Sequence, residues 1–117
     1  MSDAPWIEAA SGVLEALQSE QPPSKDDQRN AVKASLAELV ERAPGRSVEV
    51  RVPPFAAVQV IEGATHRRGT PPAVVETDVA TWLGLALGTL AWQEAVTTGR
   101  VRASGARSDL SEYLPLV

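Results

Sequence analysis

The sequence contains no cysteine, which excludes disulfide bridges, thiolate nucleophiles and cysteine-ligated metal sites. Its only histidine is His66, and a zinc or iron site normally draws three or four ligands from the cysteine and histidine set. The chain opens without a basic segment followed by an apolar run, so no signal peptide is expected. The longest stretch without a charged side chain is 79–93, and two glycines interrupt it, which makes it too short to cross a bilayer. We therefore expect a cytoplasmic protein with no metal, no cofactor and no stable membrane insertion.

Positive charge is in the minority, with 11 lysines and arginines against 15 aspartates and glutamates. The imbalance lies in residues 1–45, which carry eight acidic and four basic side chains, whereas residues 46–117 carry seven of each. Proteins that bind nucleic acid normally show a basic footprint, so no nucleic-acid partner is expected. At 117 residues, with 44% hydrophobic and 22% charged residues, the composition is that of a single globular domain.

Two amphipathic helices are predicted at the start of the chain. Apolar residues recur at helical spacing over 3–20 and again from Ser24 to Ala43, with the breaker "QPPSKDD" between them. Asp3 is the expected N-cap of the first helix, and Ser24 with Asp27 resembles a capping box for the second. We divide the single domain, 1–117, into an appended helix and linker, 1–23, and a core, 24–117.

The pattern then changes to a period of two. Strands are predicted at 46–52, 56–63 and 73–78, followed by helices over 79–88 and 90–98 and a last strand near 100–104. Thr77 or Asp78 is the expected cap of the third helix and Thr89 that of the fourth, and Ser108 is expected to cap a short turn at 109–114. Strands in a run with helices grouped around them indicate an α+β fold with a mostly antiparallel sheet of about four to five strands covered by helices.

The second half of the chain resembles the sterol carrier protein family, and in particular its small actinobacterial branch. The resemblance is carried by "ETDVATWLGLALG", "TLAWQEAVTTG" and "RVRASG", a helix–Gly–helix–Gly–strand–Gly progression, together with "ERAPGRSVEVRVPPFAAVQVIEG", "RGTPP" and "DLSEYLPL". It covers about residues 38–117. Longer members generally continue after Gly105 into another strand and a terminal helix, whereas here twelve residues remain.

The resemblance implies an apolar tunnel between sheet and helices, which in some members holds sterols or fatty acyl chains. The residues expected to line it are Val58, Val60, Trp82, Leu83, Leu87, Trp92 and Val96. Such side chains are more often core than ligand contacts. Tyr113 and the apolar tail have three open interpretations: a plug, a dimer contact or a loosely docked end.

The second expectation is a binding site for the anionic head group of a ligand. Arg51, His66, Arg67, Arg68, Arg100 and Arg102, with Arg107, are candidates because guanidinium forks suit carboxylates and phosphates. The competing interpretation is a solvated strand face in which the arginines pair with Glu49, Glu62 and Glu76.

No catalytic constellation is present, because one histidine would have to serve any serine and no P-loop lysine exists. We therefore predict a protein that is not an enzyme and that binds a lipid, fatty acyl or sterol-like molecule. The alternative is an accessory or protein-interaction domain with a packed core and no lipid cargo, acting on a partner protein or as a homodimer.

Overall fold

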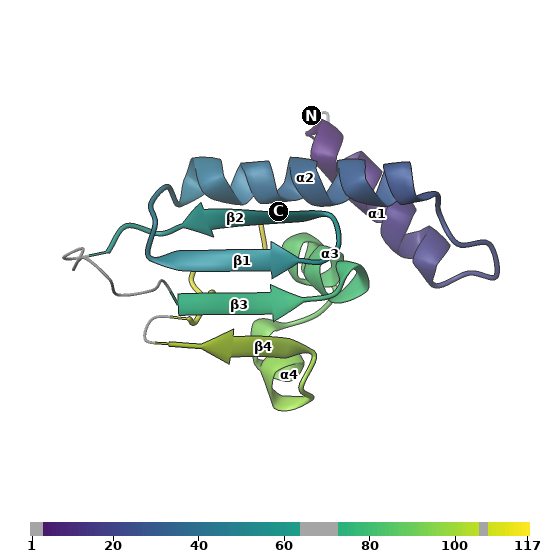
Figure 1. The fold of residues 1–117 in the computed structure, drawn as a ribbon. Coiled ribbons are helices and arrows are strands. Elements are labelled where there is room, and N and C mark those ends of the chain that lie inside the picture. Colours follow the sequence, from purple (N-terminus) through teal and green to yellow (C-terminus); the bar gives the residue numbers. More distant parts are fainter. Residues whose placement is uncertain (1–3, 64–72, 106–107) are drawn as a thin grey trace.

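A computed structural model describes residues 4–63, 73–105 and 108–117 (Figure 1). The predicted order of elements, two helices, three strands, two helices and a strand, is confirmed. The elements are α1 (Pro5–Leu17), α2 (Lys25–Arg42), β1 (Val48–Val52), β2 (Ala56–Val60), β3 (Ala73–Thr77), α3 (Val79–Leu87), α4 (Trp92–Thr97) and β4 (Val101–Ser104).

The four strands form one sheet in the order β2-β1-β3-β4. The outer pairs, β1–β2 and β3–β4, are antiparallel, and the central pair β1–β3 is parallel. The central pair is parallel because β2 returns the chain to the end of the sheet at which β1 began, so β3 starts from the same end. The α+β prediction is confirmed, and the sheet is mixed rather than wholly antiparallel.

The sheet has one covered and one open face, as the alternation along β1 shows. Val48, Val50 and Val52 are buried, whereas Glu49 is half-buried and Arg51 is exposed. The register carries the same division to β2 and β3, whereas in β4 only Val101 is buried. In Figure 1, α2 runs alongside β2 and α4 lies beside β4, and each helix contacts that strand. The helices thus flank both edge strands, which limits exposure of unpaired backbone groups.

The N-terminal helices pack on each other, and α1 also contacts α3. Trp6 and Leu14 of α1 belong to the same hydrophobic cluster as the covered face of the sheet. The N-cap of α1 is Ala4, which offers no side-chain cap, and Asp3 lies outside the described residues.

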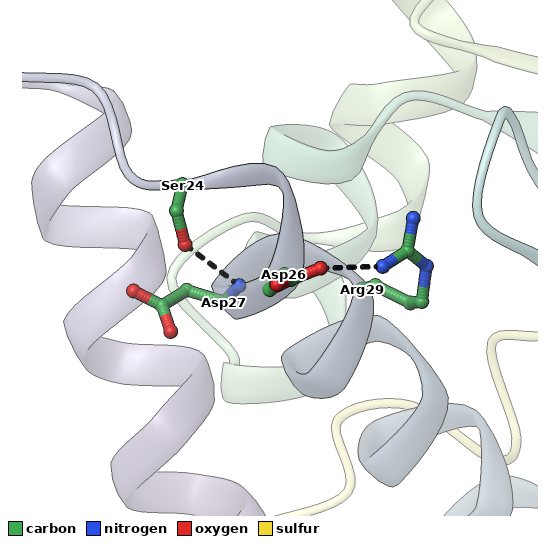
Figure 2. Close-up of polar contacts among 4 residues, drawn as sticks. All are labelled: Ser24, Asp26, Asp27 and Arg29. Atoms are coloured by element: carbon green, nitrogen blue, oxygen red, sulfur yellow. Dashed lines mark hydrogen bonds and ion pairs between the residues drawn. The ribbon is translucent and has the colours of Figure 1, made fainter.

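The N-terminus of α2 carries half of the predicted capping box (Figure 2). The hydroxyl of Ser24 accepts a 3.0 Å hydrogen bond from the backbone N–H of Asp27. No reciprocal bond to the Asp27 carboxylate occurs among the described residues, and the dashed line that joins the two residues in Figure 2 ends on the backbone nitrogen of Asp27. Instead Asp26 pairs with Arg29 at 2.7 Å, and the Arg29 guanidinium lies 5.7 Å from the ring centroid of Phe55. This cation–π contact joins the first turns of α2 to the chain just before β2.

Helix α3 is buried over most of its length. Of the two expected caps, Asp78 is the one used: its carboxylate accepts from the Thr81 N–H at 2.8 Å. Gly88 ends the helix in the left-handed conformation at φ 83°, as glycine favours. The expectation that Thr89 caps α4 is wrong, because α4 begins at Trp92 and the Thr89 N–H donates back to the Gly84 carbonyl.

The last ten residues, 108–117, form a tail without helix or strand. The carboxylate of Asp109, rather than Ser108, accepts a 2.8 Å bond from the Ser111 N–H, which corrects the expected cap. Leu110 and Leu116 of the tail are fully buried. In Figure 1 the tail passes behind the sheet, on the same side as α3.

Candidate functional site

The residues expected to line a tunnel fall into two groups in the structure. Three of these residues are buried, with 1% exposure or less. The other four are partly or largely exposed to solvent. The buried ones are Val60, Trp82 and Leu83, the half-buried ones are Val58, Leu87 and Trp92, and Val96 is 39% exposed. Their exposures therefore range from fully buried to 39%, and the residues belong to β2, α3 and α4.

The interior beside these residues is nearly free of unpaired polar groups. Trp82 donates its indole N–H to the hydroxyl of Ser35 at 2.8 Å, and Ser35 in turn donates to the Ala31 carbonyl at 2.7 Å. In the part of the chain that the structure describes, the one buried side-chain polar atom without a partner is Nε1 of Trp6. A molecule placed against the covered face would therefore need aliphatic surface rather than hydrogen-bonding groups there.

Two surface pockets lie beside α3 and share Asp78 and Arg100, and a third, of about 490 Å³, lies over β3 and β4. One has a volume of about 410 Å³ and lies between α1 and α3. A second, of about 310 Å³, adjoins it and shares Asp78 and Arg100 with it. The first is lined by Leu14, Gln18, Asp78, Ala80, Thr81, Gly84, Thr89, Leu90 and Arg100. Both volumes fall at the lower end of the range of small-molecule sites.

Arg100 has a fixed backbone at this position. Its N–H donates to the Ala95 carbonyl at 2.9 Å, and its carbonyl accepts from the Thr77 hydroxyl at 3.2 Å. Among the described residues, no ion pair involves its guanidinium. Arg100 thus lines two pockets and has no ion-pair partner among the described residues, and Arg102, which lines the smaller of the two, likewise has none there.

The other candidate arginines that the structure describes lie on the open face of the sheet. Arg51 pairs with Glu49 of the same strand and lies opposite Glu76 in the register. Arg102 lies opposite Glu76 from the other side. Glutamate between two arginines is the cross-strand arrangement expected of a solvated charged face.

The remaining head-group candidates, His66, Arg67 and Arg68, lie outside the described residues, as does Arg107. Within the described residues there is no group of three or more histidine, aspartate or glutamate side chains placed to hold a metal ion. Over the same residues, no helix has the length and apolar content needed to cross a membrane.

Sequence reasoning missed two features of this region. Ser35 interrupts an otherwise apolar helix face, and its polarity gave no indication that its partner would be an indole 47 residues away. The burial of Leu110 and Leu116 was also left open, although the apolar ending "PLV" is the signal that was available.

Comparison with known proteins places the chain in a family. A family model described as bacterial SCP ortholog, where SCP stands for sterol carrier protein, matches residues 24–116. The match includes all four strands and leaves out α1. No curated protein matches the chain.

Proposed function

Because the chain belongs to the bacterial sterol carrier protein ortholog family, we propose that it binds an apolar or amphipathic small molecule, without catalysing a reaction. The apolar part of this ligand lies between the covered face of the sheet and the helices. From the sequence we expect the protein to be located in the cytoplasm.

One observation carries the proposal: the expected lining residues differ widely in exposure, from fully buried to well exposed. Trp82 and Leu83 are at 1% exposure or less, Leu87 and Trp92 are half-buried, and Val96 is 39% exposed. An amphipathic ligand has the same gradient, with a chain that leaves water and a head group that does not. This correspondence supports a chain directed inward from the α3–α4 side.

The energetics permit such binding. Burial of each methylene contributes about 0.8 kcal/mol, so a sixteen-carbon chain contributes about 12 kcal/mol before costs. Association and ordering remove about 4–15 kcal/mol. At the lowest cost in that range the remainder, about 8 kcal/mol, corresponds to micromolar affinity.

The test uses the tryptophans as energy donors to a dansyl-labelled fatty acid. Trp82 and Trp92 lie among the proposed contacts, whereas Trp6 belongs to α1, outside the family match. We expect saturable energy transfer that falls in Trp92→Phe and persists in the matched control Trp6→Phe. Native mass spectrometry of the purified protein, followed by organic extraction, identifies any bound molecule. No saturable transfer and a bare polypeptide mass would contradict the proposal.

A second candidate is an interaction domain with a filled core, and the burial of the tail favours it. Leu110 and Leu116 are both at 0% exposure, so side chains of the protein itself occupy that part of the interior. Under this alternative, the dansyl probe does not bind, and sedimentation shows a homodimer or a complex with a partner protein.

A further inference from the structure

The tail, residues 108–117, contributes to the core in a way that differs from every helix and strand. Leu110 and Leu116 are fully buried, yet the tail contains no regular element. Its own hydrogen bonds are local, from the Ser111 N–H to Asp109 and from the Tyr113 and Leu114 N–H groups to the Leu110 carbonyl. Two core side chains are therefore held by a segment with little structure of its own.

The tail is held to the rest of the protein by apolar packing and few hydrogen bonds. Among the described residues, one backbone hydrogen bond crosses from the tail to another element, from the Leu116 N–H to the Ala86 carbonyl at 2.9 Å. Close packing is found near the C-terminus of α3, where a Cβ built on Gly88 would lie 3.3 Å from Pro115 and 3.8 Å from Val117. Release of the tail would break this one bond and expose the two leucines, while every strand pairing stays intact.

The tail also lies in the layer where the ligand is proposed to bind. Figure 1 shows it behind the sheet together with α3, and the Leu116–Ala86 bond places it against that helix. Ala86 neighbours Leu87, one of the expected lining residues. Leucine side chains and an alkyl chain present the same kind of apolar surface, so one can replace the other at the cost of the single Leu116–Ala86 hydrogen bond.

We propose that the tail is an intramolecular occupant of the ligand site, and that an aliphatic chain binds by displacing Leu110 and Leu116 from the covered side of the sheet. This inference rests on the proposed function. Two leucine side chains vacate a small apolar volume, which suits a fatty acyl chain better than the fused rings of a sterol. The observed affinity is reduced by the fraction of molecules whose tail is already displaced, so fastening the tail must weaken binding.

The sharpest test fastens the tail with the double variant Gly88→Cys, Val117→Cys. The chain has no cysteine, so the two introduced thiols can pair only with each other within one molecule. A Cβ at Gly88 would lie 3.8 Å from Cγ2 of Val117, so a small shift of the last residue is enough to bring the two Cβ atoms to the roughly 3.5–4.5 Å of a disulfide. The same protein is measured oxidised and reduced, so any effect of the substitutions on folding is common to both forms.

Binding of a dansyl-labelled sixteen-carbon fatty acid is expected to be at least tenfold weaker in the oxidised form than in the reduced form. The control, Gly88→Cys alone in its monomeric form, is expected to bind equally with and without oxidant. A second variant, Leu116→Ala, is expected to bind the probe more tightly than wild type, because it weakens the competing occupant. A fluorescent sterol is expected to bind more weakly than the fatty acid.

The outcomes separate the two proposals. Equal binding by the oxidised and reduced forms, with binding by wild type, would overturn the tail inference and leave the proposed function standing. Absence of binding by wild type, the reduced variant and Leu116→Ala would overturn the proposed function, and the inference with it. If the reduced variant alone fails to bind, Leu116→Ala decides: affinity at or below that of wild type would overturn the inference.

Discussion

The indole N–H of Trp82 and the hydroxyl of Ser35 form a buried 2.8 Å hydrogen bond that joins α3 to α2. Ser35 is at 0% exposure and Trp82 at 1%, so water cannot take the place of either partner. A hydrogen bond in such surroundings contributes modestly when made, and the loss of one partner costs the desolvation of the other.

Replacing Ser35 with alanine therefore leaves the Trp82 donor buried and unpaired. We expect Ser35→Ala to lower the free energy of unfolding by about 1–3 kcal/mol. Urea denaturation followed by tryptophan fluorescence measures the change. In the background of Trp82→Phe, the same serine substitution should cost clearly less, and equal costs in both backgrounds would contradict a coupling between the two residues.

Trp6 differs from Trp82 in that its buried indole N–H has no hydrogen-bond partner. Its Nε1 is buried without a partner, so Trp6→Phe removes an unpaired donor along with part of the ring. Trp82→Phe removes a paired donor and leaves a hydroxyl behind. We expect Trp6→Phe to be less destabilising than Trp82→Phe by about 1 kcal/mol or more, measured by thermal and urea unfolding. A larger loss for Trp6→Phe would show that the unpaired indole has no energetic consequence.

Two glycines are expected to respond in opposite directions to alanine. Gly45 adopts φ 148°, and a Cβ there would lie 2.1 Å from the carbonyl oxygen of Ile61. That oxygen already accepts the N–H and the hydroxyl of Ser47, so it is not free to move. We expect Gly45→Ala to lower the free energy of unfolding by about 2 kcal/mol or more. Gly12 lies in α1, and a Cβ built there has nothing within 4 Å. We expect Gly12→Ala to raise the free energy of unfolding by up to about 1 kcal/mol.

The tail is expected to respond to acid through Asp109. The Ser111 N–H, and then the Ser111 side chain, donate to this carboxylate and lower its pKa in the folded protein. A lowered pKa stabilises the folded state above the pKa of the unfolded carboxyl, and this contribution is lost as pH falls through the folded value. Between pH 5 and pH 2, wild type should therefore lose more stability than Asp109→Asn. Identical pH profiles in chemical denaturation would contradict this role.

Arg100 and Arg51 offer a matched test of head-group recognition. Arg100 lines the two pockets around Asp78, whereas Arg51 lies on the open face beside Glu49. We expect Arg100→Ala to weaken binding of a fatty acid about tenfold, the loss of one charge-assisted hydrogen bond, and to leave a fatty alcohol of equal length unaffected. Arg51→Ala should change neither affinity, and a change common to both variants would point to net charge alone.

The sequence by itself determined the order and type of the elements. The alternation of Val48, Val50 and Val52, the helical spacing of apolar residues in the first two helices, and the capping residues Ser24 and Asp78 are short-range features. Each is contained in a window of a few residues, where the period of side-chain burial distinguishes helix from strand. The resemblance to sterol carrier proteins could likewise be recognised from the sequence, because contiguous motifs carry it.

Only the tertiary structure decided how distant segments meet. The parallel pairing of β1 with β3, the contact of Ser35 with Trp82, and the burial of Leu116 join residues far apart in the chain. No local period encodes such pairings, because each depends on the shape that all the other elements leave to be filled. The open face of the sheet, which carries Arg51 and Arg102, and the tail packed beside α3 are consequences of that packing.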